Sequence, residues 1–416
     1  MKINDLESAV NYLKSSVSYE DIVKYRYGEE VFDLKRFSAF LDEYCPEYKK
    51  LKAIHVTGSK GKGTTSNLIY SYLNRVGFKA GVFNSPYILN ITESIGVGGK
   101  FISLKNFIKY VNELKKFREQ FNESHNLSKV SYFELLTAIG FKYFVDCGVD
   151  YVVLEVGLGG RLDSTNVCRP VVTVLTRVEK EHTEILGKTY TKILNEKLGI
   201  VKEWNVKHKV PLVVAPQKKI VKENILSRRL NVPVFFVEKN FDKHDDNYST
   251  ALVALLNLIN VDLWRFDDVY SGLKMVGRFD VRRFGSVEAV FDMAHTPQSA
   301  EMLVNKLNEK FGADAEFVFI FSMMKEKDAK GFFEKIKKIK LRKIIFTSSH
   351  ETRSESIAVL NKIFRKTFGA YAKNIEIELI DDVENAFEKA LMYKKWDRYL
   401  VVTGSHFLIS KILRKV

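Results

Sequence analysis

The sequence predicts an α/β protein of two domains: an N-terminal domain with a phosphate loop on a mostly parallel β-sheet, and a smaller C-terminal Rossmann-like domain. Short apolar runs alternate with longer segments of helical periodicity, which is typical of parallel sheets covered by helices. A glycine-rich segment, 58–63, follows one apolar run and precedes a helical segment. The length of 416 residues exceeds one ordinary core and therefore favours two domains.

The N-terminal domain is expected to span residues 1–275. It begins with a helical lead-in, 1–50, which ends at Cys45-Pro46 because proline favours a break there. The predicted strands are the apolar run before residue 57, 79–83, 150–155, 171–175, 211–215 and 233–237. The predicted helices are 65–76, 104–121, 132–147, 188–203, one between the strands 211–215 and 233–237, 248–259 and 267–275. Residues 88–102 predict an irregular loop or hairpin, and 238–247 a charged loop.

The C-terminal domain is expected to span residues 276–416, and its strands and helices alternate again. The predicted strands are 287–291, 316–321, 343–347, 375–380 and 399–402. The predicted helices are 297–311, 330–339, 354–368, 383–392 and 406–413.

Composition excludes several classes of protein. Hydrophobic residues make up 46% of the chain, enough for two buried cores. The three cysteines, Cys45, Cys147 and Cys168, have no CxxC spacing and favour reduced structural thiols over a disulfide framework or zinc site. The N-terminus lacks the pattern of a signal peptide, and no apolar stretch is long enough to span a membrane, so we expect a cytoplasmic protein without a membrane partner.

The formal net charge of +15 suits anionic partners. Lysine and arginine are spread over predicted helical faces and do not gather into a basic stripe with interleaved aromatic residues. We therefore expect small anionic ligands, no nucleic-acid partner, and a monomer.

The segment 55–65, HVTGSKGKGTT, is the strongest local signal for a ligand. Its glycines leave backbone N–H groups free to face a polyanion, the following helix adds its positive end, and Lys62 adds an ammonium group. The general phosphate-loop pattern GxxxxGK[ST] fails here, since Gly63 separates Lys62 from Thr64. The alternative is a turn that binds nothing. The position between strand and helix favours a nucleotide triphosphate.

Three side chains near strand ends suggest a magnesium site. Ser85, Glu155 and His182 follow three predicted strands of the first domain, and open α/β sheets place their sites at that edge. Magnesium prefers few protein ligands together with phosphate oxygens and water. Each residue alone has an ordinary alternative: the Glu as a cap or ion-pair partner, and the His as a surface or core residue.

Lys197 lies within a predicted helix, where a solvated lysine is the ordinary interpretation.

In the second domain, Asp292 ends an apolar strand, and His295 follows before a helix that starts with proline. This arrangement suits an acid that binds a ribose and an imidazole near a base or phosphate. The residues alone therefore indicate a two-domain enzyme that binds ATP and magnesium.

Several motifs in collinear order resemble those of the folylpolyglutamate synthase and dihydrofolate synthase family, a branch of the Mur ligase superfamily, from about residue 50 to the C-terminus. The strongest is 154–166, LEVGLGGRLDSTN, close to the family's LEVGLGGRLDATN. The others resemble GTNGKGS at 58–64, SPH at 85–87, DHTxxLG at 181–187, EKAGIIK at 196–202, PGR at 276–278, DGAH at 292–295 and TGS at 403–405.

The resemblance implies a Mur ligase central-domain type of N-terminal domain and ATP-dependent ligation in the cleft between domains. The implied ATP-binding residues are Gly58, Ser59, Lys60, Gly61, Lys62, Gly63, Thr64, Asn247, Arg278, Asp292 and His295. The implied magnesium ligands are Ser85, Glu155 and His182. The implied catalytic residues are Lys62, Lys197 and His182, with Lys197 matching a family lysine that is carbamylated and can hold a second metal.

Substitutions touch several family motifs. Ser59-Lys60 replaces Thr-Asn, Tyr87 replaces the His of SPH, Ser94 replaces the Arg of NERI, and Glu181 replaces the Asp before His182. Further changes are Val276 for Pro, Met293 for Gly and Thr296 for Asn, with His244 and Tyr248 for the Gln and Ala that flank the family asparagine matched by Asn247.

The resemblance therefore implies a folylpolyglutamate synthase of one-carbon metabolism that adds L-glutamate to a folate through an acyl phosphate. Dihydropteroate as the substrate, alone or as a second activity, stays open. So do a diverged nucleotide-binding protein with another substrate or no ligase activity, and a nucleic-acid-binding ATPase.

Overall fold

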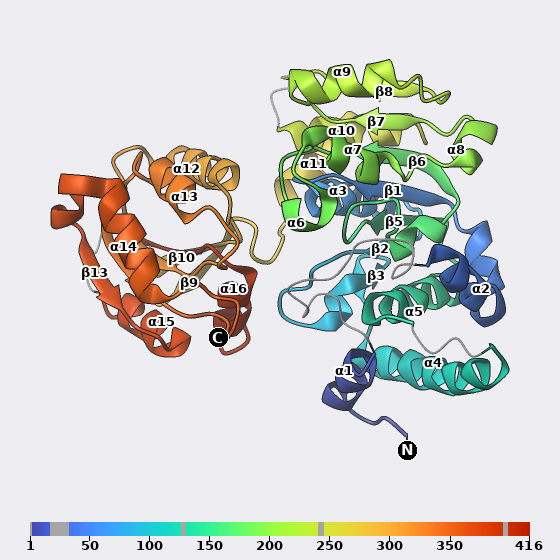
Figure 1. The fold of residues 1–416 in the computed structure, drawn as a ribbon, viewed down its shortest axis with the longest axis horizontal. Helices are drawn as coiled ribbons and strands as arrows, with labels where there is room; N and C mark the ends of the chain where they lie inside the picture. The colour runs from blue at the N-terminus through green and yellow to red at the C-terminus, as the bar shows by residue number, and fades with distance from the viewer. Residues whose placement is uncertain (1, 17–32, 126–129, 240–244, 394–397) are drawn as a thin grey trace. The chain divides into compact units, whose positions relative to one another are not determined.

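The computed structural model describes residues 2–16, 33–125, 130–239, 245–393 and 398–416. The chain divides into two units, Met1–Leu273 and Lys274–Val416 (Figure 1). Parts of the predicted lead-in and of the charged loop at 238–247 lie outside the described residues. Among the helices described, none has the length and apolar character needed to cross a membrane.

The first unit is built on an eight-stranded sheet with the order β4-β3-β2-β5-β1-β6-β7-β8. Six strands are parallel, and β3 and β4 form an antiparallel hairpin against β2, which confirms the mostly parallel sheet and the hairpin alternative for 88–102. The strands are β1 Ala53–Thr57, β2 Ala80–Phe83, β3 Ile95–Val97, β4 Lys100–Phe101, β5 Tyr151–Glu155, β6 Pro170–Leu175, β7 Leu212–Val214 and β8 Val234–Phe236.

Helices cover both faces of this sheet (Figure 1). Successive strand residues point to opposite faces, so Val152 and Leu154 pack into a core with α4 and α5, whereas Val153 packs into a core with α3, α10 and α11. The α-helices are α1 Leu6–Lys14, α2 Leu34–Tyr44, α3 Lys62–Arg75, α4 Leu104–His125, α5 Tyr132–Cys147, α6 Thr183–Leu186, α7 Tyr190–Leu198, α8 Glu203–Lys207, α9 Lys219–Ser227, α10 Asp246–Leu256 and α11 Leu263–Gly272. Short 3₁₀ helices are η1 Pro46–Lys50, η2 Ile91–Ser94 and η3 Ser164–Val167.

The single helix predicted over 188–203 is wrong, because the structure has two helices, α7 and α8, separated at Gly199. A Cβ atom on Gly199 would lie 2.3 Å from the Cβ of Arg161, so only glycine allows the 157–166 loop to approach this closely. Asn166 Nδ2 then donates 3.0 Å to the Gly199 carbonyl. Tertiary packing, which helical periodicity does not report, ends α7 here.

The second unit has a six-stranded sheet with the order β13-β12-β11-β14-β10-β9. Five strands are parallel and β9, which the sequence analysis missed, pairs antiparallel with β10. β9 is only partly buried and lacks the apolar run that marks its neighbours. The strands are β9 Asp280–Phe284, β10 Val287–Asp292, β11 Glu316–Phe321, β12 Lys340–Phe346, β13 Glu376–Leu379 and β14 Arg398–Thr403. The helices are α12 Pro297–Phe311, α13 Ala329–Ile336, α14 Ile357–Phe368, α15 Val383–Leu391 and α16 His406–Leu413, with a 3₁₀ helix, η4, at Gly369–Asn374.

Candidate active site

Four neighbouring parallel strands of the first unit, β2, β5, β1 and β6, carry the predicted site residues at their carboxyl ends. In this order the strands lead to Ser85, Glu155, the phosphate loop 58–61, and His182. Carboxyl ends of adjacent parallel strands meet at one edge, where open α/β sheets bind ligands. The sheet topology therefore gathers residues that lie up to 124 positions apart, from 58 to 182, at one edge.

The phosphate loop needs glycine at two positions. Gly58 and Gly61 have φ angles of +145° and +92°. A Cβ atom on Gly58 would lie 1.9 Å from Thr176 Oγ1, and one on Gly61 would lie 2.1 Å from Asn247 Oδ1. Gly61 is also the N-cap of α3, which has no side-chain cap, so the helix presents its first N–H groups without an internal competitor.

Two lysines converge on one carbonyl of this loop. Lys62 Nζ donates 3.2 Å to the Gly58 oxygen, and Lys197 Nζ donates 2.7 Å to the same oxygen. Lys197 also forms an ion pair with Glu181, with 3.2 Å between Nζ and Oε1. The structure thus places Lys197, which the sequence analysis left with a solvated alternative, beside the phosphate loop and only 1% exposed.

Burial sets the charge state of this ion pair. Burial lowers the pKa of Lys197 to about 8, aided by nearby Lys62 and opposed by Glu181. For Glu181, burial acts to raise the pKa, but Lys197, Lys62 and His182 outweigh it and lower the value to about 2. Glu181 is therefore ionised at neutral pH. Lys197 is partly deprotonated near physiological pH, because its pKa is about 8.

The glycine-rich loop 157–166 positions the end of α7 that carries Lys197. A Cβ atom on Gly160 would lie 2.9 Å from the Lys197 carbonyl oxygen. Arg161 N donates 2.7 Å to the Glu196 carbonyl, and its guanidinium pairs with the Glu196 carboxylate at 3.1 Å. Buried Asp163 holds the loop itself by accepting hydrogen bonds from Leu158 N and Thr165 N.

Ser85 and Glu155 lie together at the ends of β2 and β5. Ser85 N donates 3.3 Å to Glu155 Oε2, and the Glu155 side chain is buried. The preceding Asn84 has a buried Oδ1 atom with no hydrogen-bond partner. Within the described ranges, no three His, Cys, Asp or Glu residues cluster as a ready metal site. This oxygen-rich set fits magnesium, which needs few protein ligands when phosphates and water complete its shell.

His182 has a left-handed backbone, with φ of +47°, and is the N-cap of the short helix α6. Its backbone carbonyl accepts hydrogen bonds from Ile185 N and Leu186 N, which fix the turn after Glu181. Its assignment as a magnesium ligand stays a prediction.

Asn247 lies against the phosphate loop. Asp245 caps α10 by accepting from Asn247 N and Tyr248 N at 2.9 and 3.0 Å, which directs the Asn247 side chain toward Gly61. Tyr248, which replaces the family's Ala, instead packs in the α3–α10–α11 core, where its hydroxyl bonds Asp267. Neighbouring helix residues point in different directions, so this substitution leaves the loop-facing asparagine in place.

The three candidate residues of the second unit gather around two turns. Asp292, at the end of β10, accepts from Phe279 N at 2.8 Å and from Ala294 N at 2.9 Å, and burial raises its pKa. His295 Nδ1 contacts the Met293 carbonyl at 2.8 Å, so Nδ1 carries the proton. Arg278 follows Gly277 in the turn that Asp292 holds, which makes Asp292 a structural support of that turn.

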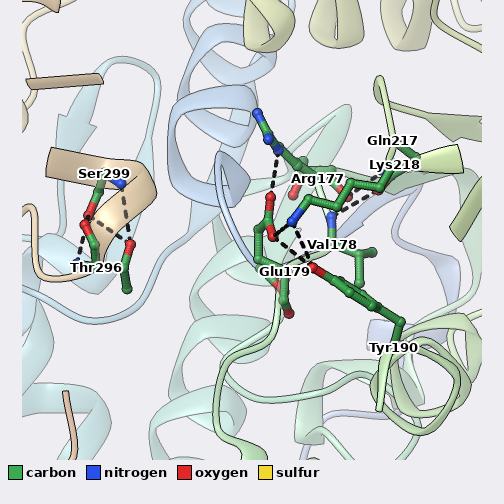
Figure 2. Close-up of polar contacts among 10 residues, drawn as sticks. Arg177, Val178, Glu179, Tyr190, Gln217, Lys218, Thr296 and Ser299 are labelled. Atoms are coloured by element: carbon green, nitrogen blue, oxygen red, sulfur yellow. Dashed lines mark hydrogen bonds and ion pairs between the residues drawn. The ribbon is translucent and has the colours of Figure 1, made fainter. Parts of the chain in front are cut away.

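The sequence did not predict two acidic residues of the segment between β6 and α6: Glu181, which pairs with Lys197, and Glu179. Glu181 was noted only as a substitution, although it supplies the ion pair. Glu179 was not singled out, although its side chain is buried and binds three polar side chains (Figure 2). The available signal was a pair of acidic residues directly after a buried strand that ends beside the phosphate loop.

The glycine loop between β1 and α3 lies beside half-buried Lys62 and buried Lys197, and buried Glu155 ends the adjacent strand. This arrangement defines a nucleotide-binding α/β protein. Comparison with known families narrows this class. Residues 56–282 match the Mur ligase middle domain, and residues 277–406 match the Mur ligase, glutamate ligase domain. The chain belongs to the Mur ligase family.

Individual relatives confirm the resemblance to folylpolyglutamate and dihydrofolate synthases. The dihydrofolate synthase/folylpolyglutamate synthase of Bacillus subtilis is 27% identical over 96% of this chain and 99% of its own. A Mycobacterium tuberculosis folylpolyglutamate synthase complexed with ADP has a TM-score of 0.83 at 20% identity, covering 98% of each chain. A bifunctional Yersinia pestis enzyme complexed with AMPPNP and Mn has a TM-score of 0.78 at 21% identity, covering 99% of this chain and 98% of its own.

Proposed function

We propose that the protein is an ATP-dependent ligase that joins the amino group of L-glutamate to a carboxylate of a folate, with release of ADP and phosphate. The observation that carries this proposal is the convergence of Lys62 and Lys197 on the phosphate loop, at the uncapped N-terminus of α3. The name of the Bacillus subtilis relative, matched over nearly its full length, supports folate as the substrate class.

The proposed reaction has two chemical steps. The folate carboxylate attacks the γ-phosphorus of ATP and forms an acyl phosphate with ADP as the leaving group. The glutamate amine then attacks the acyl carbon, and phosphate leaves. Charge grows on the transferred phosphoryl group in the first step, so prepositioned cations and N–H groups lower its barrier. Lys62 and the backbone N–H groups of Gly58, Gly61, Gly63 and Thr64 would supply these groups. The amides of Ser59 and Lys60, which the resemblance also implied, are instead bonded to the Arg177 carbonyl.

Magnesium would be held by Ser85, Glu155 and His182, and would neutralise charge on the phosphate oxygens. Glu155 is already oriented by Ser85 N, so its carboxylate does not have to be ordered when the ion arrives. Asn247, beside Gly61, lies near the nucleotide in this proposal. The roles of Arg278, Asp292 and His295 in binding nucleotide stay predictions, as does the domain boundary at residues 275/276.

We further propose that Lys197 is carbamylated in the active enzyme. Its lowered pKa, about 8, supports the reaction, because only the neutral amine attacks CO₂. The nitrogen forms a bond to carbon and loses one proton, which gives a carbamate anion. That anion would add an oxygen ligand for a second divalent ion beside the phosphates.

The carbamate has a direct test. Wild-type protein is incubated with ¹³C-bicarbonate and examined by ¹³C NMR beside Lys197→Gln. We expect a carbamate resonance that the variant lacks. An identical spectrum for the two proteins would contradict the modification.

Phosphate release by the purified protein tests the main proposal. We expect release that requires ATP, magnesium, L-glutamate and a reduced folate together. A rate that does not depend on glutamate would contradict amide ligation. Replacing tetrahydrofolate with dihydropteroate tests the alternative of dihydrofolate synthase or a bifunctional enzyme, which the combined name of the Bacillus subtilis relative favours.

A further inference from the structure

The segment 176–179, directly after β6, is hydrogen-bonded to the end of β1 through Thr176 and to the phosphate loop through Arg177 and Glu179. Thr176 N donates 2.7 Å to the Thr57 carbonyl. The Arg177 carbonyl accepts from Ser59 N at 2.8 Å and from Lys60 N at 3.1 Å, and Ser59 Oγ donates 3.0 Å to the Glu179 carbonyl. The conformation of the phosphate loop therefore depends on where this segment lies.

The other side of the segment is held by side chains from two helices (Figure 2). Glu179 Oε2 accepts from Lys218 Nζ at 2.6 Å and from Tyr190 OH at 3.3 Å, while Oε1 accepts from Arg177 Nε at 2.9 Å. Lys218 Nζ also donates 2.7 Å to Tyr190 OH. Lys218 precedes α9, and Tyr190 begins α7, so one carboxylate links the segment to both helices.

The Glu179 side chain is only 5% exposed, and it pairs with Arg177 and Lys218. A buried carboxylate is costly unless cations and hydrogen-bond donors surround it, as they do here. If the carboxylate were lost, Lys218 would have no anionic partner on this segment. The segment would keep its backbone hydrogen bonds, the bond from Ser59 Oγ, and the two bonds that the Gln217 side chain makes with Thr176 and Val178. Glu179, Arg177, Tyr190 and Lys218, which we call the Glu179 cluster, thus support the phosphate loop through segment 176–179 and are not themselves part of that loop.

We propose that Glu179 is a positioning residue for nucleotide binding: by joining Arg177, Tyr190 and Lys218, it holds segment 176–179 against the phosphate loop. The inference rests on the proposed function, because it takes that loop to bind ATP. The two loop amides bonded to the Arg177 carbonyl are directed away from the ligand, so the cluster also determines which N–H groups remain for the phosphates.

The experiment measures nucleotide affinity by calorimetry and KM for ATP by phosphate release, on full-length Glu179→Gln and Lys218→Met. Lys222→Met is the matched control. Lys222 lies one turn along α9, has the same 39% side-chain exposure as Lys218, and also pairs with a glutamate, Glu238, but that glutamate is exposed. We expect KM for ATP to rise about tenfold in both cluster variants, with a smaller change in kcat, and no change in the control.

A stability measurement separates positioning from a general structural role. Tyr190→Phe removes one neutral hydroxyl, which donates to Glu179 and accepts from Lys218, and leaves the Glu179–Lys218 ion pair in place. It should therefore fold and raise KM for ATP by about twofold to threefold. Cluster variants that lose thermal stability but bind ATP as the wild type does would overturn the proposal, as would an equal effect in Lys222→Met. Wild-type protein that binds no ATP would instead overturn the proposed function.

Discussion

At the scale of single residues, the site contains a buried ion pair that lies directly against the phosphate loop. Lys197 is nearly inaccessible to water, yet its ammonium contacts the Gly58 carbonyl and Glu181. A sequence motif can point to Lys62 and Glu155, because each follows a predicted strand. It could not reveal the Glu181–Lys197 pair, since the two residues lie 16 positions apart in separate elements and meet only through tertiary packing.

Lys62→Ala should lower kcat/KM about 100-fold or more, because the phosphoryl transfer step loses a positioned cation. Phosphate release under saturating glutamate and folate provides the measurement. Lys79→Ala, an exposed lysine at the start of β2, serves as the control and should retain the wild-type rate. A Lys62→Ala enzyme with normal turnover would show that the phosphate assignment is incorrect.

The lowered pKa of Glu181 predicts how stability changes in acid. A carboxyl whose folded pKa lies below its unfolded value contributes stability above the unfolded value, and that stability is lost as pH falls. For Glu181 the window runs from about pH 4.5 down to about pH 2. Urea unfolding across this range should show wild type losing on the order of 3 kcal/mol more than Glu181→Gln. Parallel curves for the two proteins would argue against the ion pair.

At the scale of elements, hydrophobic periodicity predicted most of the strands and the site residues at their carboxyl ends. Helical and strand periodicity located the parallel strands of both sheets, because the central strands are buried on both faces and form clear apolar runs. It failed at Gly199, where close packing against Arg161 ends α7, and at β9, whose partly exposed residues lack an apolar run. The end of α7 at Gly199 depends on a contact with a distant segment, and the periodicity of the local sequence carries no information about such contacts.

The phosphate loop predicts a difference between two glycine substitutions. Gly61→Ala combines a left-handed backbone with a clash against Asn247 Oδ1, whereas Gly98→Ala, at φ of +61°, meets no atom within 4 Å. Gly98→Ala should cost about 1 kcal/mol of unfolding free energy and leave KM for ATP unchanged. Gly61→Ala should cost about 2 kcal/mol or more and weaken ATP binding. Urea unfolding and calorimetric titration give both quantities, and equal effects in the two variants would refute the packing argument.

At the scale of the whole molecule, each unit has its own sheet and its own buried cores. The chain enters the second unit through residues 274–279, and Asp292 attaches that stretch to the end of β10 through Phe279 N. Phe279 itself has a left-handed backbone, with φ of +52°, which the carboxylate bond helps to maintain. The first turns of the second unit therefore depend on one acidic side chain.

Asp292→Ala should destabilise the second unit by about 1–3 kcal/mol, because two backbone N–H groups lose their acceptor. Asp292→Asn should cost less, since an amide oxygen can still accept one of these bonds. Thermal unfolding compares the two variants, and limited proteolysis with sequencing of the products shows whether cleavage increases near residues 274–279. Unchanged proteolysis in Asp292→Ala would contradict the attachment.

The oxygen that Lys62 and Lys197 share belongs to the main chain, so mutation cannot delete it in the way it can delete either lysine. Epistasis follows from this. When one lysine is replaced, the Gly58 oxygen accepts only from the other, whose ammonium can then move. The loss of activity in the double variant should therefore differ from the sum of the losses in the two single variants, measured as free energies.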